Sequence, residues 1–173
     1  MDPSETKDTD GDGVGDNGDF APEDKDIWME SQVKYTGLCT PDSDKVNFEA
    51  LLTEDCTYLS AFNLFSDMTN PTTGVRGNKS LPYDLSTPLF TDYATKYRFI
   101  VLPEDSSAEF NDKEVFEMPV GTVLIKTFSL PVDTSERGFD KESLIETRLL
   151  IHRESGRDAL PYVWSADGSA AKL

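Results

Sequence analysis

The chain has 173 residues, enough for one domain of ordinary size and a short additional segment. Its 33 acidic residues outnumber its 16 lysines and arginines, which gives a formal net charge of −17. Because phosphate groups are bound by clustered cations, so acidic a chain is not expected to bind nucleic acid or an anionic membrane surface. No apolar run reaches the length of a membrane-spanning helix, so membrane insertion is not expected either.

The segment from Asp8 to Asp19 has the spacing of a calcium-binding loop. Carboxylates occupy loop positions one, three, five, nine and twelve, and a glycine occupies position six. This spacing places oxygen ligands around a hard cation, with Gly13 forming the sharp turn and Val14 offering its backbone carbonyl. We therefore predict a Ca²⁺ site formed by Asp8, Asp10, Asp12, Val14, Asp16 and Asp19.

Two other interpretations of this segment remain open. A run of like charge is often a solvated, flexible tail. That tail is one interpretation, and the second is a helix-loop-helix calcium sensor. Pro3 and Pro22 disfavour the sensor because they lie where its flanking helices would form. The residues DTDGDGVGDNGD, followed by Phe20 and Pro22, resemble a bacterial thrombospondin type 3 repeat. That resemblance implies calcium binding, with Asp24 and Asp26 as further ligands.

Cys39 and Cys56 are the only cysteines. In an exported chain they can form a disulfide across 16 intervening residues, which would contribute about 3 kcal/mol through chain entropy. Two separate thiols are the alternative. Because Cys-x-x-Cys motifs are missing, we expect neither a zinc ribbon nor a covalent haem in this chain. Weak calcium loops suit compartments with millimolar calcium, so we expect an exported protein that is extracellular, at the cell surface or periplasmic.

We place a boundary near Asp26, between an acidic calcium-binding loop (1–26) and a β-rich domain (27–173). A brief extended piece is expected over 33–41. Residues 42–44 can cap a helix that begins near Lys45, and a further helical turn is expected over 54–62. Phe48, Leu51 and Leu52 are expected to share one face of the first helix, and the further turn is expected to bring Cys56, Leu59 and Phe62 together.

Apolar runs and alternating patterns dominate the rest of the chain. Residues 81–93 carry two prolines, which predicts an irregular extended segment across the core. Strands are predicted over 97–102, 122–130, 144–153 and 160–164, with a turn at 111–112 leading into 114–118. Asp167-Gly168 predicts a hairpin turn followed by a short strand, which either continues into a longer protein or adds to a partner. The pattern predicts a mainly β fold: an antiparallel β-sandwich or barrel-like domain with a few short helices.

Several motifs resemble the N-terminal β-rich region of exported bacterial di-haem c-type cytochromes. They are PYDLSTPLFTDY at 82–93, KYRF at 96–99, PVGTVLIKTF at 119–128, ETRLL at 146–150 and LPYVW at 160–164. The similarity covers roughly Cys56 to Leu173 and implies a leading domain beside a haem domain in a longer chain. The haem-binding motifs of that family are missing here, so electron transfer is assigned to no residue of this chain.

The sequence offers few candidates for catalysis, and we expect no enzyme. His152 is the only histidine, and we expect a hydrogen-bonded or exposed strand residue; an axial ligand to haem carried elsewhere is the alternative. Asp84 and Asp92 can form an acid pair, although capping and turn roles are commoner for aspartate beside proline and serine. Lys126 interrupts an apolar strand. We expect its aliphatic stem to lie along the protein surface, which explains a lysine at this position without a catalytic role.

The aromatic residues of 83–99 can form either a sugar-stacking surface or part of the core, and we expect the core. They are Tyr83, Phe90, Tyr93, Tyr97 and Phe99. The function expected from the sequence is an exported, calcium-binding, non-catalytic structural or assembly domain that binds a protein partner or copies of itself. The alternatives are an accessory domain of a c-type cytochrome and a carbohydrate-binding module.

Overall fold

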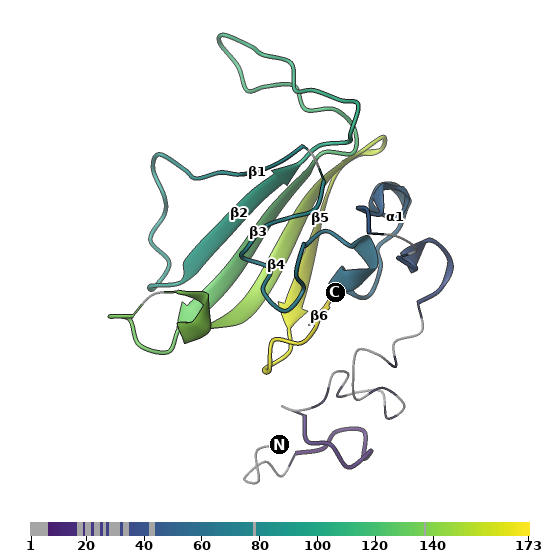
Figure 1. The fold of residues 1–173 in the computed structure, drawn as a ribbon, viewed down its shortest axis with the longest axis vertical. Helices are drawn as coiled ribbons and strands as arrows, with labels where there is room; N and C mark the ends of the chain where they lie inside the picture. Colours follow the sequence, from purple (N-terminus) through teal and green to yellow (C-terminus); the bar gives the residue numbers. More distant parts are fainter. Residues whose placement is uncertain are drawn as a thin grey trace.

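A computed structural model describes residues 7–16, 35–41, 44–77, 79–136 and 138–173, together with residues 19, 22, 25, 27 and 32. Six antiparallel strands form one sheet in which neighbours in sequence are neighbours in space (Figure 1). The strands are β1 (Ser80–Pro82), β2 (Thr95–Val101), β3 (Val123–Pro131), β4 (Glu142–Arg153), β5 (Gly156–Trp164) and β6 (Ala171–Lys172).

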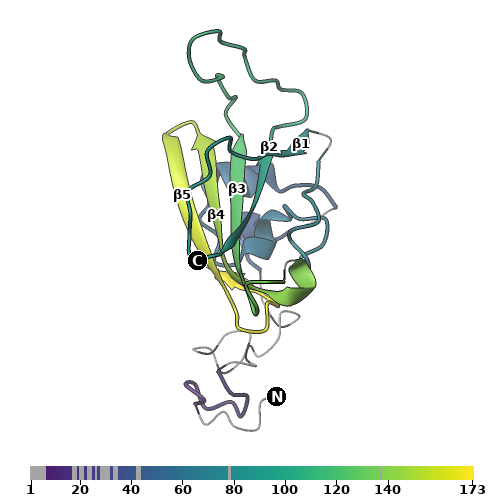
Figure 2. The ribbon, with the colours of Figure 1, turned by 90° about the vertical axis from the view of Figure 1, so that its left-hand side faces the viewer.

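Short helical segments cover one face of this sheet (Figure 2). They are the 3₁₀ turn η2 (Gly37–Cys39), the helix α1 (Phe48–Thr53) and the 3₁₀ turn η3 (Leu59–Phe62); a further turn, η4 (Phe139–Lys141), precedes β4. Asn47 caps α1, because its side-chain oxygen accepts a hydrogen bond from the Ala50 amide at 3.2 Å. The cap is therefore Asn47 and not Asp44, the one described residue of the expected cap at 42–44. Residues 42 and 43 lie outside the described part of the chain.

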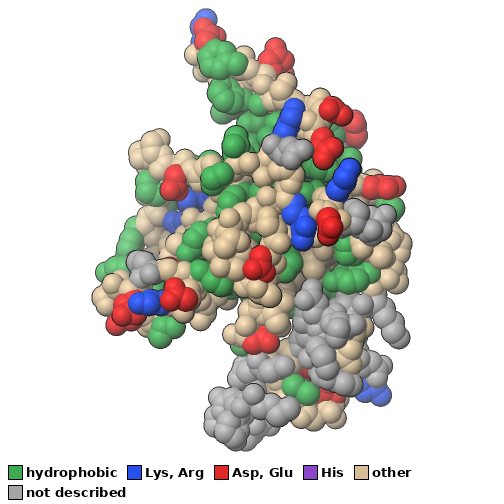
Figure 3. All heavy atoms as spheres, viewed as in Figure 1, with side chains coloured by type: hydrophobic (Ala, Val, Ile, Leu, Met, Phe, Trp, Pro, Cys, Tyr) green, Lys and Arg blue, Asp and Glu red, His purple; other side chains and the backbone are tan. Residues whose placement is uncertain are grey.

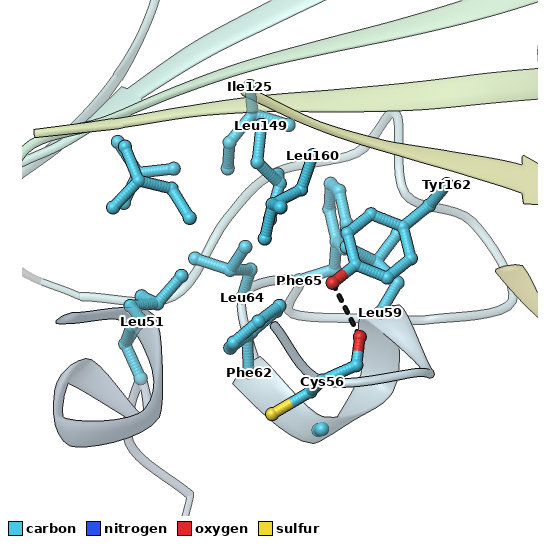
Figure 4. Close-up of a cluster of buried hydrophobic side chains, with 14 of the residues drawn as sticks. Leu51, Cys56, Leu59, Phe62, Leu64, Phe65, Ile125, Leu149, Leu160 and Tyr162 are labelled. Atoms are coloured by element: carbon cyan, nitrogen blue, oxygen red, sulfur yellow. Dashed lines mark hydrogen bonds between the residues drawn. The ribbon is translucent and has the colours of Figure 1, made fainter. Parts of the chain in front are cut away.

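The core lies between the covered face of the sheet and residues 46–65. Alternate residues of β4 point inward, so that Leu149 and Ile151 are fully buried, as the alternating pattern predicts. Figure 4 shows Leu51 and Phe62 from the helical layer facing Ile125 and the other inward side chains of the sheet. One face of the sheet is thus a conventional apolar interior.

A disulfide joins Cys39 to Cys56, as predicted, and no free cysteine remains. It links η2 to the segment between α1 and η3, so the helical layer is cross-linked within itself. The buried Tyr162 hydroxyl donates to the Cys56 carbonyl at 2.7 Å, which fixes this segment against β5 (Figure 4). Burial raises the pKa of the Tyr162 phenol above its ordinary value.

The mainly β class and the few short helices are confirmed. The described strands lie in a single sheet, and helical turns and loops occupy the layer where a sandwich has its second sheet. Residues 114–118 contribute only an isolated bridge between Glu109 and Glu117. The predicted C-terminal hairpin is present, since β6 pairs with β5 of the same chain. None of the helices in the described ranges is long and apolar enough to cross a membrane.

The segment 81–93 differs from expectation. Pro82 lies in β1, an edge strand, where a missing amide donor is tolerated. The residues that follow leave the sheet, and Phe90 and Tyr93 are exposed by 73% and 55%. The expectation that these two aromatic rings lie in the core is therefore wrong, because the chain here forms a loop beside β2. Phe99 is buried as expected, and Tyr97 packs against the core.

Arg153 joins the end of β4 to the helical layer. It is 8% exposed, and its guanidinium donates to the Leu51 carbonyl at 2.8 Å and the Glu54 carbonyl at 2.7 Å. It also forms ion pairs with Asp55 at 2.9 Å and Asp158 at 3.1 Å. Carbonyls at the end of a helix have no partner within the helix, so this arginine satisfies groups that the short helix α1 leaves open.

A second polar network joins three strands on the covered face. The Glu142 carboxylate accepts hydrogen bonds from Thr95 at 2.7 Å, Tyr97 at 3.0 Å and Ser129 at 2.5 Å. Burial by itself would raise the pKa of this carboxyl, but these hydroxyl donors outweigh it and hold the pKa of Glu142 below its usual value. The charged form of Glu142 therefore connects β4 to β2 and β3.

Replacing Arg153 by methionine should destabilise the domain. Two carbonyls would lose their donor and two carboxylates their partner, at a cost of about 2 to 4 kcal/mol. Thermal denaturation should show a midpoint lower by about 5 to 12 °C. The matched control is Arg157→Met, because Arg157 is exposed on β5 and the charge change is the same. Equal midpoints for the two variants would contradict the role given to Arg153.

Glu142→Gln should lower stability in a pH-dependent way. Because the folded pKa of Glu142 is lowered, its contribution is fully present above the ordinary glutamate pKa and is lost as pH falls through the lowered value. In urea denaturation at pH 7 the free energy of unfolding of the variant should be lower by about 1 to 2 kcal/mol. The difference should shrink below about pH 4. Glu136→Gln, at an exposed ion pair with Lys141, is the control and should show neither effect.

Candidate metal centre

The N-terminal loop is folded around the carboxylate of Asp8. Its Oδ1 accepts a hydrogen bond from the Gly11 amide at 2.7 Å, and its Oδ2 accepts one from the Gly13 amide at 3.1 Å. Both glycines have positive φ, 79° and 95°, which a residue with a side chain rarely adopts. The glycines of the motif are therefore needed for the turn that places their amides on Asp8.

Asp10 and Asp12 form the next two local turns. The Oδ1 of Asp10 accepts from the Asp12 amide at 3.2 Å, and the Oδ1 of Asp12 accepts from the Val14 amide at 2.7 Å. The second oxygen of each carboxylate is buried and has no hydrogen-bond partner. A buried carboxylate oxygen without a partner is costly, so these two atoms call for a positively charged ligand.

The structure brings together three of the predicted ligands. Asp8, Asp10 and Asp12 each offer one carboxylate oxygen, and these atoms lie within 4.8 Å of one another. Each pair of like charges at such a separation costs between about 1 and 4 kcal/mol, depending on the local dielectric. The donor set is entirely carboxylate oxygen, which suits a hard cation such as Ca²⁺ or Mg²⁺ and does not suit zinc or copper.

Asp16 and Asp19 do not join that group. Asp16 forms an ion pair with Lys7 at 2.7 Å and accepts hydrogen bonds from the amide and hydroxyl of Thr9. The hydrogen bond from Lys7, followed by that from Thr9, holds the pKa of Asp16 below its usual value. Asp19 is buried. In this arrangement Asp16 closes the loop on Lys7, whose carbonyl also accepts the Asp16 amide at 2.9 Å.

Some residues of the predicted calcium loop and its flank lie outside the described part of the chain. Loop residues 17 and 18 lie outside the described part of the chain, as do Asp24 and Asp26, the further ligands that the repeat resemblance implies. The expected domain boundary near Asp26 falls in the same region. Val14 is described, and its amide binds Asp12.

The candidates considered for other chemistry have structural partners. The Nδ1 of His152 lies 2.9 Å from the Met118 carbonyl, which is the hydrogen-bonded strand residue expected. Asp84 pairs with Arg98 at 3.0 Å, and Asp92 lies in a turn with a φ of 43°. The turn role expected is therefore found for Asp92, and Asp84 forms an ion pair instead of the acid pair considered as the alternative.

Sequence reasoning missed one group of charged residues. Arg98, Lys126 and Arg148 lie directly opposite one another on three adjacent strands. Alternation along each strand predicts which face each residue occupies, but only the pairing register places the three side by side. Of the three, the sequence pattern distinguished only Lys126, which interrupts an apolar strand.

Comparisons with protein-family models, with curated proteins and with solved structures gave no match for this chain. The candidate metal centre therefore rests on the geometry of its own residues.

Proposed function

We propose that the loop from Asp8 to Asp19 binds Ca²⁺ and that the protein is an exported, calcium-binding, non-catalytic structural or assembly domain. The observation that carries the calcium part is the convergence of Asp8, Asp10 and Asp12, with an unpartnered buried oxygen on two of them. A cation bound there would neutralise three carboxylates and supply the missing partner of both oxygens.

Calcium is favoured over magnesium because a short, irregular loop supplies the ligands. Magnesium requires nearly ideal octahedral geometry and keeps several waters, whereas calcium accepts irregular carboxylate and carbonyl shells. The ligands here come from one short, glycine-containing stretch. The disulfide between Cys39 and Cys56 supports an oxidising compartment outside the cytosol, where calcium is plentiful.

Exposed apolar side chains support an assembly role. The loop between β2 and β3 extends beyond the sheet (Figure 1) and carries hydrophobic side chains on its surface (Figure 3). Within it Phe110 is 74% exposed and Val115 is 83% exposed. Large apolar groups gathered in a projecting loop are typical of a protein contact surface.

Calcium binding can be tested by calorimetric titration of the chelator-treated protein. We expect heat on addition of calcium and slower hydrogen exchange at the amides of Gly11 and Gly13, which donate to Asp8, and of Val14, which donates to Asp12. The double variant Asp10→Asn, Asp12→Asn keeps the shape of both side chains and removes two charges. It should bind calcium at least about tenfold more weakly.

The matched control for this titration is Asp67→Asn with Asp133→Asn. Both aspartates form similar local turns, with Thr69 and Ser135, on the surface of the β-rich domain, and the charge change is the same. This control should bind calcium as the unmodified protein does. A titration of the unmodified protein without heat, or equal affinity of the two double variants, would refute the metal centre.

The assembly role can be tested by sedimentation over a range of protein concentrations in calcium. We expect the unmodified chain to associate and the double variant Phe110→Ser, Val115→Ser to associate at least about tenfold more weakly, because the apolar contact is removed. The control is Val132→Ser, at an 86% exposed position in another loop. A monomer at every concentration would count against self-assembly, and equal association of all three proteins would exclude this loop as the contact.

A further inference from the structure

The sheet has a second face, which points away from residues 46–65, and we call it the outer face. Apolar side chains form a row across it, because the strand register places each opposite the next. Leu81 pairs with Ile100, Ile100 with Leu124 and Leu124 with Leu150. An apolar row of this kind is ordinarily found inside a protein.

The next row on the same face consists of cations. Arg98 lies opposite Lys126, and Lys126 lies opposite Arg148. We call these three residues the cationic row. Like charges directly opposite one another on neighbouring strands are destabilising. In a chain with a net charge of −17, three adjacent cations are a local reversal of the overall charge.

The acidic side chains near the cationic row do not balance it. Asp84 pairs with Arg98 at 3.0 Å, and Glu146 binds Arg148 through two hydrogen bonds of 2.8 Å. Lys126 contacts no carboxylate of the described residues; its ammonium lies 4.4 Å from the centre of the Phe128 ring. Burial, and then the charges of Arg98, Lys96 and Arg148, hold the pKa of Lys126 below its usual value. Lys126 is therefore the one cation of the row without an ion pair of its own, because the nearby Glu146, whose charge it also senses, has both oxygens bonded to Arg148.

An apolar groove of about 700 Å³ adjoins this row. The sheet forms one wall, through Leu81, Ile100 and Leu124, and the β2–β3 loop forms the other, through Ala108, Phe116 and Met118. Leu124 and Lys126 are two residues apart on the same face of β3, so the groove and the lysine are about 7 Å apart along the strand. Tyr83 also lines the groove, and its amide donates to the Arg98 carbonyl at 3.2 Å.

We propose that the outer face binds a small amphiphilic carboxylate, with its apolar body in the groove and its carboxylate over Lys126 in the cationic row. The charge of the ligand would complete the row, in which three cations have two acidic partners. Its body would cover the apolar side chains of the groove. Neither contact involves the calcium loop, so this binding is independent of the metal centre.

The size of the groove argues for a small molecule rather than a folded partner. Small-molecule pockets usually enclose about 300 to 1,000 Å³ and combine an apolar lining with a few polar groups that orient the ligand. The groove has this size and an apolar lining, and the one lysine within the lining, Lys79, donates to the Ser106 carbonyl. Lys126 lies beyond the lining, about 7 Å along β3 from Leu124, and would orient a ligand whose charged end extends out of the groove. The groove lies between the sheet and the β2–β3 loop, and its size and lining suit an alkyl or aromatic body.

The proposal is tested with decanoate as the probe, on the full chain with calcium present. Calorimetry should detect binding of decanoate, and backbone NMR shifts should be largest in residues 81–83, 98–102 and 124–126. Decan-1-ol, which has the same chain and no charge, should bind at least about tenfold more weakly, since it lacks the ion pair. Acetate, which lacks the apolar body, should not bind measurably.

Two variants separate binding from folding. Lys126→Gln should weaken decanoate binding about tenfold and leave the melting temperature unchanged or raised, because it removes one of three opposed cations. Ala108→Trp should weaken binding by filling the groove without altering any charge. The control is Lys141→Gln, at an exposed pair with Glu136, which should bind decanoate as the unmodified protein does.

Several outcomes would overturn the proposal. One is the absence of decanoate binding at millimolar concentration, and another is NMR shifts confined to other parts of the chain. Equal binding of decanol would remove the role of the cationic row. A less stable Lys126→Gln variant with unchanged affinity would make the lysine a structural residue only. Self-association through the outer face that decanoate does not displace would identify a contact between copies of the chain instead.

Discussion

The fold depends on covering a single face of the sheet with residues 46–65. A six-residue helix and a 3₁₀ turn are too short to be stable alone, so their stability comes from packing on the sheet. Arg153 makes that packing specific, because it bonds the carbonyls that α1 leaves open while its stem lies within β4. The disulfide between Cys39 and Cys56 then restrains the same layer from its other side. The helical layer and the sheet are therefore stable only together.

The uncovered face of the sheet follows from the same arrangement. A meander of six strands has two faces, and the described residues provide one helical layer with which to cover them. The outer face keeps apolar side chains such as Leu124 beside cations such as Lys126, which is unusual for a surface exposed only to water. A surface of this composition is better suited to a ligand with both an apolar and an anionic part. The loops that follow β1 and β2 border this face and remain largely exposed.

Charge is distributed unevenly along the molecule. Most of the chain is acidic, and the density of carboxylates is greatest in the N-terminal loop, where Asp8, Asp10 and Asp12 converge. Opposed cations occur instead on the outer face. The charges within each group repel one another, and the ligand proposed for each would relieve that repulsion: a divalent cation in the loop and a carboxylate on the sheet. The two sites share one physical origin, which is like charge held close together by local backbone structure.

Local sequence determined the elements and the three carboxylates of the candidate metal centre that converge, out of six predicted ligands. Alternation predicted β2 to β5, the Asp-Gly pair predicted the last hairpin, and the Asp-Gly spacing predicted three converging carboxylates, because all of these depend on residues close in the chain. The disulfide was one of two open possibilities. Tertiary structure alone decided the single sheet, the exposure of Phe90 and Tyr93, and the role of Arg153, three of whose four partners lie about a hundred positions earlier. It also decided the cationic row. The face on which a side chain lies follows from alternation along its own strand, whereas its neighbours on other strands follow from the register between the strands.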